Sequence, residues 1–459
     1  MTDEGAITEA ELAAFHHAVG RLRELPVDDP VRLRAEQVAA SFARDGRLRR
    51  RKARGADVSA ADAATMAATA TGAVDRREDA PLGAAGGPVG RSDELVGHAD
   101  AGGGVYRKPR SCYVCKSPYR QVDSFYHRLC PDCAADNSAR RALSTDLSGR
   151  RVLLTGGRVK IGFQLALMML RDGAELLVTS RFPHDAVRRF RAEPGSGKWL
   201  DRLTVLAVDL RDPRQVLGLC EELRQAGEPL DILVNNAAQT VRRPPQSYAL
   251  LAAGERDALP EGARQAPGFT PMWMLAGGAS TLPVVLREAD EAGLLPDPSP
   301  ENSWSARLGA LDPAEVLETQ LVNALAPALL CDRLLPLLLA SPRPRRYVIN
   351  VTAVEGRFAV RNKMPGHPHT NMAKAALNML TRTSAAELAH QGVHMCAVDT
   401  GWITDENPAP KKDRMAGAGF RTPLDIVDGA ARVYDPIVRG ESGDPVSGVF
   451  LKDYREAAW

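Results

Sequence analysis

The sequence of 459 residues predicts an α/β protein whose main domain is a doubly wound parallel sheet. From residue 147 to the end, short runs rich in Leu, Val and Ile alternate with amphipathic helical stretches, as in strands covered on both faces. A helical N-terminal region and a short segment with two CxxC pairs precede this alternation. The length also exceeds one core of ordinary size, so we expect several domains.

The composition is that of a soluble globular protein, with 44% hydrophobic and 25% charged residues. The net charge of +2 gives no global field that would favour nucleic acid or an acidic membrane surface. The start, "MTDEGAITEAELAAF", lacks the basic residues and apolar stretch of a signal peptide. No run reaches the roughly 18 uncharged apolar residues of a membrane span. We therefore expect a cytoplasmic protein that binds neither membranes nor nucleic acid.

Residues 1–55 predict a helical region, in which Thr8 caps a first helix and Glu11 completes the capping box. A second helix ends in the basic run "RLRRRKAR", which we interpret as a solvated helix end rather than a nucleic-acid contact. Residues 56–105, with "GAAGGPVG" and "AGGG", predict a flexible linker.

Residues 106–140 predict a small zinc ribbon, because "CYVC" and "CPDC" stand in a C-x2-C-x14-C-x2-C arrangement. Four thiolates suit tetrahedral Zn²⁺ and leave no open coordination position, so we expect a structural site; an iron site or a redox dithiol are the alternatives. The predicted metal ligands are Cys112, Cys115, Cys130 and Cys133. The basic stretches "KPR" and "KSPYR" and the aromatic residues Tyr119, Phe125 and Tyr126 would also permit the ribbon to bind a partner or nucleic acid, without requiring it.

The domain at 147–459 contains seven predicted strands, in "RRVLLT", "AELLVTS", "LTVLAVD", "DILVNNA", "RRYVINV", "GVHMCAVD" and "SGVFLKD". An insertion at about 240–312 interrupts the alternation of strands and helices. Its length is unusual for a loop inside a compact domain. Its apolar residues Met272, Trp273, Met274 and Trp304 indicate a folded insertion that serves as a lid or a partner surface.

A tight glycine turn follows the first strand of this domain and opens a helix. Glycines let the backbone approach a pyrophosphate, and the N-terminus of the helix stabilises its charge. The predicted dinucleotide-binding residues of this turn are Thr155, Gly156, Gly157, Arg158, Lys160, Ile161 and Gly162.

With its other motifs, this domain resembles the short-chain dehydrogenase/reductase family, whose members have a Rossmann-type NAD(P)-binding domain. Thr155, Gly156 and Gly162 match the family's TGxxxGxG motif, while Lys160 replaces the middle glycine. By the same resemblance, other stretches are expected to line the dinucleotide site: "VDL" with Asp209 and Leu210, "NNAA" with Asn236 and Ala237, "LVNALAP" with Asn323, and "TGWIT" with Gly401 and, further along, Thr404 or Asp405.

The second strand of the domain ends in "TSR", where an acid would accept the adenosine ribose hydroxyls of NAD. Arg181 stands there instead and could pair with a 2′-phosphate, so we expect NADP rather than NAD as the cofactor. Alternatively, Arg181 merely stacks on the adenine, which would not distinguish the two.

The family's catalytic serine and tyrosine are both replaced, by Ala353 and Thr370, whereas Asn323 and Lys374 of its ribose-organising set remain. Thr370 is a poor general acid, because an aliphatic alcohol has a far higher pKa than a phenol. His369, with His367 and Glu355 nearby, is a candidate replacement proton donor; otherwise these histidines pack within a loop.

We therefore expect an NADP-dependent oxidoreductase with altered proton delivery, acting on a small molecule that the sequence does not identify. The alternatives are a catalytically inactive dinucleotide sensor or scaffold, and a non-redox enzyme such as an epimerase or lyase on the same fold. The helices "LETQLVNALAPALLCDRLLPLLL" and "MAKAALNMLTRTSAAELA" correspond to those through which the family pairs subunits, so the resemblance also implies a homo-oligomer.

Overall fold

The computed structural model describes residues 7–83, 103–271, 289–360 and 363–459. The chain divides into two compact units, Met1–Ala64 and Thr65–Trp459. The predicted apolar residues of the insertion at 272–274, Met272, Trp273 and Met274, lie outside the described residues, as do residues 84–102 of the predicted linker.

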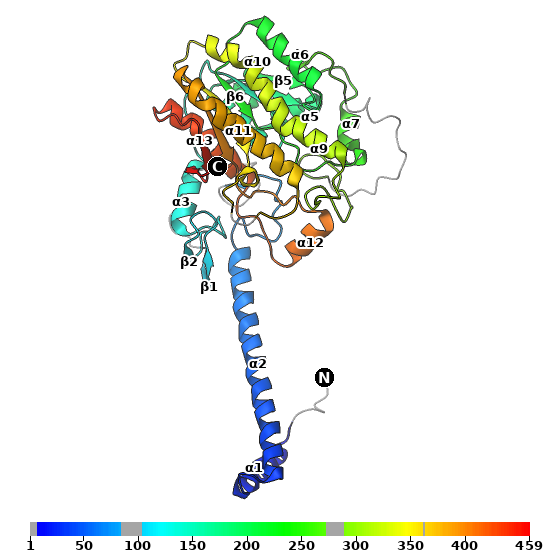
Figure 1. Ribbon diagram of the computed structural model, residues 1–459, viewed down its shortest axis with the longest axis vertical. Helices are drawn as coiled ribbons and strands as arrows, with labels where there is room; N and C mark the ends of the chain where they lie inside the picture. Colours follow the sequence, from blue (N-terminus) through cyan, green and yellow to red (C-terminus); the bar gives the residue numbers. More distant parts are fainter. Residues whose placement is uncertain (1–6, 84–102, 272–288, 361–362) are drawn as a thin grey trace. The chain divides into compact units, whose positions relative to one another are not determined.

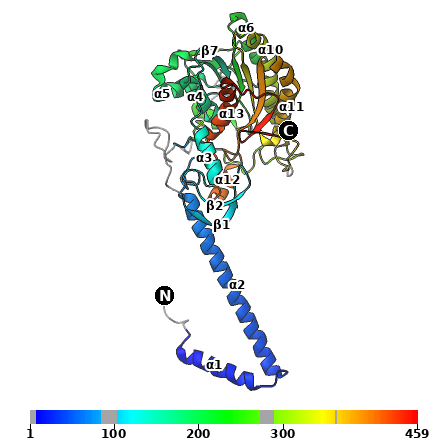
Figure 2. The ribbon, with the colours of Figure 1, turned by 90° about the vertical axis from the view of Figure 1, so that its left-hand side faces the viewer.

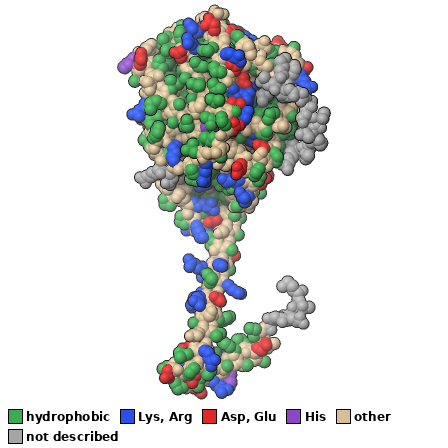
Figure 3. All heavy atoms as spheres, turned by 45° about the vertical axis from the view of Figure 1, so that its right-hand side comes forward, with side chains coloured by type: hydrophobic (Ala, Val, Ile, Leu, Met, Phe, Trp, Pro, Cys, Tyr) green, Lys and Arg blue, Asp and Glu red, His purple; other side chains and the backbone are tan. Residues whose placement is uncertain are grey.

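The N-terminal unit is formed by two helices, α1 (Glu9–Glu24) and most of α2 (Pro30–Ala67). The predicted capping box is present: the amide of Glu11 donates to the hydroxyl of Thr8, and the carboxylate of Glu11 accepts from the amide of Thr8. Basic side chains of α2 are exposed to solvent (Figure 3), which agrees with a solvated basic run. The helix continues to Ala67, well beyond residue 55, so the linker begins later than predicted.

Nine strands form one sheet in the order β11-β10-β9-β8-β6-β3-β4-β5-β7, parallel except at β11. The predicted doubly wound sheet and its seven strands are confirmed. The strands are β3 (Arg151–Leu154), β4 (Glu175–Ser180), β5 (Leu203–Ala207), β6 (Ile232–Asn235), β7 (Ala263–Gln265), β8 (Arg346–Thr352), β9 (Val393–Asp399), β10 (Phe450–Lys452) and β11 (Arg455–Ala457). The insertion supplies β7, which was not predicted; it pairs with β5 and extends the sheet by one edge strand.

Helices cover both faces of this sheet (Figure 1). Those that pack on it are α4 (Lys160–Arg171), α5 (Pro183–Ala192), α6 (Pro213–Ala226), α10 (Ala326–Ala340), α11 (Pro368–His390) and α13 (Ile426–Glu441). The apolar sides of α4, α5 and α13 form one core with the sheet, and those of α6, α10 and α11 form the other (Figure 2). The remaining elements are α7 (Ala249–Gly254), α9 (Pro313–Gln320), α12 (Ala409–Gly417), and the short helical turns Ser196–Lys198, Leu200–Arg202, Pro245–Tyr248, Leu321–Leu325 and Val354–Gly356.

One stretch, Pro313–Ala340, is long and apolar enough to cross a membrane by length and composition, with a mean hydropathy of 1.5. Half of its most apolar window is buried inside the protein. Because α10 lies in this stretch and contributes Leu330, Leu334 and Leu338 to the sheet core, its apolar character is that of a core helix.

The ribbon consists of an antiparallel hairpin, β1 (Val105–Ser111) and β2 (Pro118–Gln121), followed by α3 (Pro131–Arg140). Its aromatic residues Tyr119, Phe125 and Tyr126 are buried in a core that the ribbon shares with the α/β domain. They are therefore not available as the partner-binding surface that the sequence permitted. Part of the predicted linker packs here too, because the amide of Thr71 donates to the carbonyl of Phe125 at 2.8 Å.

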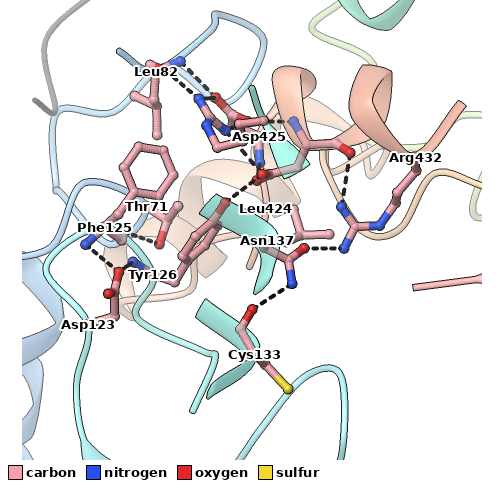
Figure 4. A network of polar contacts seen from close by, with 12 residues as sticks. Thr71, Leu82, Asp123, Phe125, Tyr126, Cys133, Asn137, Leu424, Asp425 and Arg432 are labelled. Atoms are coloured by element: carbon pink, nitrogen blue, oxygen red, sulfur yellow. Dashed lines mark hydrogen bonds and ion pairs between the residues drawn. The ribbon is translucent and has the colours of Figure 1, made fainter. Parts of the chain in front are cut away.

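A buried ion cluster fastens the ribbon to the start of α13. Arg141, which follows α3, lies 2.5 Å from Asp425 and 3.1 Å from Asp428, two carboxylates with no exposed surface. Tyr126 donates its hydroxyl proton to Asp428 at 2.6 Å, and the amide of Leu82 donates to Asp425 at 2.8 Å (Figure 4). Burial raises the pKa of Asp428, whereas Arg141 outweighs the burial of Asp425 and lowers its pKa. The cluster therefore depends on the charge of Arg141.

Replacing Arg141 with methionine should lower the free energy of unfolding by about 3–5 kcal/mol, because two buried carboxylates lose their cation. Equilibrium urea denaturation measures the change. The control is Arg214→Ala, which removes an exposed pair with Asp212 and should alter stability by less than about 1 kcal/mol. Equal effects of the two substitutions would contradict the central role of the cluster.

Candidate functional site

The four cysteines of the ribbon converge, with their sulfur atoms all within 4.8 Å of one another. The sulfurs of Cys115 and Cys130 are 3.7 Å apart. Four sulfurs about 2.3 Å from a zinc ion would form a tetrahedron with edges of about 3.8 Å. All four cysteines are free thiols rather than disulfides. The donor set and the spacing therefore fit one tetrahedral metal ion.

Local structure brings these cysteines together. Cys112 directly follows β1, and the chain turns back through Lys116, whose φ of 66° lies in the left-handed region. Cys130 caps α3, and its amide donates to the sulfur of Cys112 at 3.3 Å. His127 does not join the cluster, because its Nδ1 lies 2.8 Å from the hydroxyl of Thr71.

The glycine turn after β3 is packed too closely for any larger residue. A Cβ atom on Gly156, whose φ is 72°, would lie 2.9 Å from the Cα of Ala237. One on Gly162 would lie 2.1 Å from the carbonyl oxygen of Gly156, and one on Gly157 would lie 2.8 Å from the side chain of Val178. The turn at the N-terminus of α4 thus forms a backbone cradle of the shape that accepts a pyrophosphate.

Thr155 ties this turn to the loop after β6. Its hydroxyl accepts hydrogen bonds from the amides of Asn236 and Ala237, both at 2.9 Å. The side-chain amide of Asn236 donates in return to the carbonyl of Thr155 at 3.0 Å. The predicted residues of both motifs therefore lie side by side, at the carboxyl ends of adjacent parallel strands, where ligands bind in such sheets.

Lys160 takes up a left-handed conformation with φ of 54°. A residue with a Cβ adopts this conformation only at the cost of strain. Burial works to raise the pKa of Glu406, in the loop after β9, but Lys160 and other nearby cations outweigh burial and lower it.

At the adenosine end, Arg181 lies 5.6 Å from the ring centres of Phe182 and Tyr248, and no carboxylate among the described residues pairs with it. Asp209, the expected adenine-pocket acid, is instead bound by Arg211 through Nε at 3.0 Å and Nη2 at 2.6 Å. The sequence analysis missed Arg211, although it stands two residues after Asp209.

Three predicted residues have structural roles. Arg158, predicted to bind the dinucleotide, instead donates to Asp185 at 2.5 Å and to the carbonyl of Ala292 at 2.8 Å. Leu210 is buried in the core beneath α6 and α10, and Ile161 packs against the core that the ribbon shares.

The two retained residues of the ribose-organising set are both engaged within the protein. Asn323 has no exposed surface; it accepts from the amide of Gln239 at 2.7 Å and donates to its carbonyl at 2.9 Å. Lys374 donates its ammonium proton to the carbonyl of Val351 at 2.9 Å. Burial lowers the pKa of Lys374 to about 8, against the opposing charge of Glu355.

His369 stands next to Thr370, which occupies the position that the resemblance assigns to the family's tyrosine. Thr370 and His369, near the start of α11, are only 3% and 1% exposed. Neither ring nitrogen of His369 has a hydrogen-bond partner among the described residues, and neither does the hydroxyl of Thr370. His369 lines a cavity of about 240 Å³ together with Asp312 and Glu315. Burial lowers the pKa of His369, while Glu315 opposes the shift, so the neutral imidazole is favoured.

The other candidate groups for proton transfer are either held by partners or buried. His367 stacks on Trp304 with ring centres 3.8 Å apart, and its Nδ1 lies 3.0 Å from the carbonyl of Trp304. It therefore packs the insertion against α11. Ala353, which directly follows β8, offers no polar side chain, and burial raises the pKa of the nearby Glu355.

The loop after β9 carries Gly401, with φ of 84°, as the resemblance implied. Thr404 donates to Glu406 at 2.9 Å, and Asp405 accepts from the amide of Asn407 at 3.0 Å, so both expected nicotinamide-side residues stabilise the loop itself. Tyr113 of the ribbon also reaches this loop. No sequence signal placed Tyr113 there, because it stands inside the CxxC pair.

Comparisons with known proteins match the same region. The family model described as short chain dehydrogenase matches residues 150–252, and that described as Enoyl-(Acyl carrier protein) reductase matches residues 299–420. The gap between them lies within the predicted insertion. A solved structure titled "Pseudomonas aeruginosa RhlG/NADP active-site complex" is 20% identical, with a TM-score of 0.44, covering 67% of this chain and 95% of that one.

Two curated relatives extend the comparison. "Uncharacterized protein R665" of Acanthamoeba polyphaga mimivirus is 31% identical over 348 residues, which span 72% of this chain and 71% of that protein. A "Probable oxidoreductase" of Streptomyces antibioticus is 39% identical over 95 residues, 20% of this chain and 30% of the relative. Together with the glycine turn and the strand order, the two family-model matches show that the chain contains a domain of the short-chain dehydrogenase/reductase family.

Proposed function

We propose that this protein is an NADP-dependent oxidoreductase in which His369, rather than a tyrosine, exchanges the proton with a small-molecule substrate. The observation that carries the proposal is the buried imidazole of His369. Both of its nitrogens lack a partner among the described residues, and it lines a cavity. A buried polar group without a partner is costly, so such a group is expected where a ligand completes it.

The dinucleotide site fits the cofactor by its shape and donors. The cradle at Gly156 and Gly162, with the N-terminus of α4, would hold the pyrophosphate. Arg181, which has aromatic neighbours but no carboxylate partner among the described residues, would hold a 2′-phosphate. NADP, when bound, supplies or accepts the hydride. This arrangement supports NADP over NAD, because Arg181 stands where an acid would bind the ribose hydroxyls.

The protein's own groups would handle the proton. A neutral imidazole at His369 can accept a proton from an alcohol during oxidation, and the resulting imidazolium can return it during reduction. Glu315 would stabilise the imidazolium, since its charge already opposes the lowered pKa of His369. Lys374 would position the cofactor ribose rather than tune a phenol, because Thr370 offers none.

One observation favours a catalytically silent dinucleotide sensor as the second candidate. The side chains of Asn323 and Lys374 form hydrogen bonds with backbone groups of Gln239 and Val351, which leaves these polar atoms engaged within the protein rather than free for a cofactor. A protein that binds the dinucleotide but shows no turnover with any carbonyl or alcohol substrate would fit this alternative.

We further propose a structural zinc ion in the ribbon and a homo-oligomer formed through α9, α10 and α11. The exposed apolar side chains on these helices support subunit pairing, because burying them on a second copy would remove them from water. They are Leu317, Leu339, Met372 and Met379, together with Leu325 in the turn between α9 and α10.

Replacing Arg181 with alanine should weaken NADPH binding about 10- to 100-fold and leave NADH binding unchanged, because only NADPH carries the 2′-phosphate. Isothermal titration calorimetry measures both. Arg188→Ala, on the exposed side of α5, is the matched control and should bind both as the unaltered protein does. An equal loss of NADPH and NADH binding would mean that Arg181 contacts adenine instead.

Replacing His369 with alanine should reduce turnover about 10²- to 10⁴-fold with any substrate found by screening carbonyl compounds against NADPH oxidation. Because burial lowers the pKa of His369 from its ordinary 6.5, alcohol oxidation should be constant above pH 6.5 and fall at lower pH as the imidazole becomes protonated. Reduction should show the opposite trend. His367→Ala is the control and should keep its turnover. Full turnover by His369→Ala would contradict the proposal that His369 exchanges the proton.

Metal analysis of the purified protein should find one zinc per chain, and Cys115→Ser should lose it. Cys220, a buried thiol of α6 outside the cluster, provides the control: Cys220→Ser should retain the zinc. Zinc retained after loss of Cys115, or iron in its place, would contradict the structural zinc site.

A further inference from the structure

The ribbon shares a hydrophobic core with the parts of the domain that surround the dinucleotide site. Tyr106 and Leu129 of the ribbon cluster with Ile403, in the loop after β9, and with Leu424, just before α13. Ile161, in the glycine turn, packs against the same cluster. The ribbon therefore supports two of the motifs that the resemblance assigns to the dinucleotide.

One direct hydrogen bond joins the ribbon to the loop after β9. The amide of Trp402 donates to the hydroxyl oxygen of Tyr113 at 2.9 Å. The neighbouring Gly401 has little room: a Cβ there would lie 2.6 Å from Leu424 and 3.6 Å from the Tyr113 oxygen. The loop is thus held between the ribbon and the start of α13.

The position of Tyr113 depends on the cysteine cluster. Tyr113 stands between Cys112 and Cys115, and its amide donates to the carbonyl of Arg128 at 2.8 Å. On the other side, the ammonium of Lys452 lies 5.4 Å from the centre of its ring. A metal ion that fixes both cysteines would therefore fix the ring between them.

A second chain of contacts leads from the cluster to α13. The carbonyl of Cys133 accepts from the side chain of Asn137 at 2.7 Å, and Asn137 accepts from Arg432 of α13 at 2.8 Å (Figure 4). The guanidinium of Arg432 also lies 3.5 Å from the Cβ position of Gly401. Both ends of the cysteine cluster are thus connected to the same loop.

We propose that the ribbon is a zinc-dependent clamp that holds the loop at 400–405 in its dinucleotide-binding conformation, with Tyr113 as the positioning residue. Zinc binding and dinucleotide binding are then coupled, and each strengthens the other by the same factor. Loss of zinc would release the loop and weaken dinucleotide binding at a site that the metal does not touch. This inference rests on the proposed NADP site.

The test uses full-length, zinc-loaded protein and the substitution Tyr113→Phe, which removes only the acceptor for the Trp402 amide. Hydrogen exchange, read by mass spectrometry over peptides that span 400–405, should be about 3- to 10-fold faster in the variant, as expected for one lost hydrogen bond. The dissociation constant for NADPH should rise by a similar factor, with the zinc content unchanged.

Tyr119→Phe is the matched control, because the hydroxyl of Tyr119 donates to the carbonyl of His127 inside the ribbon. It should leave both exchange in the loop and NADPH binding as they are. Removing zinc with a chelator should reproduce or exceed the effect of Tyr113→Phe, and restoring zinc should reverse it.

The outcomes separate the two proposals. If the unaltered protein binds NADPH and Tyr113→Phe changes neither loop exchange nor affinity, the clamp is overturned and the proposed function stands. Faster loop exchange with unchanged NADPH affinity also overturns the coupling. If the zinc-loaded, unaltered protein binds no NADPH, the proposed function itself fails.

Discussion

The buried ion pair between Arg141 and the two aspartates that begin α13 is the contact on which the rest of the structure depends. Charges removed from water stabilise a fold only when each is paired and its remaining lone pairs are satisfied. Here Tyr126 and the amide of Leu82 complete the pairing. The cluster fixes the ribbon on α13, and α13 packs on α4, so the cysteine cluster and the glycine turn belong to one packed assembly.

Within that assembly, Thr155 and the glycines shape a cradle for a dinucleotide. Ala353 and Thr370 stand at the positions that the resemblance assigns to the family's serine and tyrosine, so our proposal gives the proton to another group. The internal partners of Asn323 and Lys374 reduce the free polar surface further. His369 is the exception, a buried polar side chain left without a partner among the described residues.

Sequence predicted the features that local pattern determines: the seven strands, the glycine turn and the converging cysteines. It did not predict the features that depend on contacts between residues far apart in the sequence. No periodicity reveals that Arg158 binds Asp185 or that Tyr113 reaches Trp402. β7 is only three residues long and carries no β-branched side chain, so propensity gave no signal. The Ala-rich stretch before Ala67 was interpreted as a linker, although alanine is the strongest helix former.

The long sequence separation of the ion cluster has a consequence for the order of folding. Arg141 and Asp425 are 284 positions apart, so their contact forms only after nearly the whole chain has been synthesised. The cysteines lie within a short segment whose loop closure costs little entropy. We therefore expect the ribbon to fold around the proposed metal ion first and to pack on α13 later. Pulse-labelled refolding would then show ribbon amides protected before those of α13.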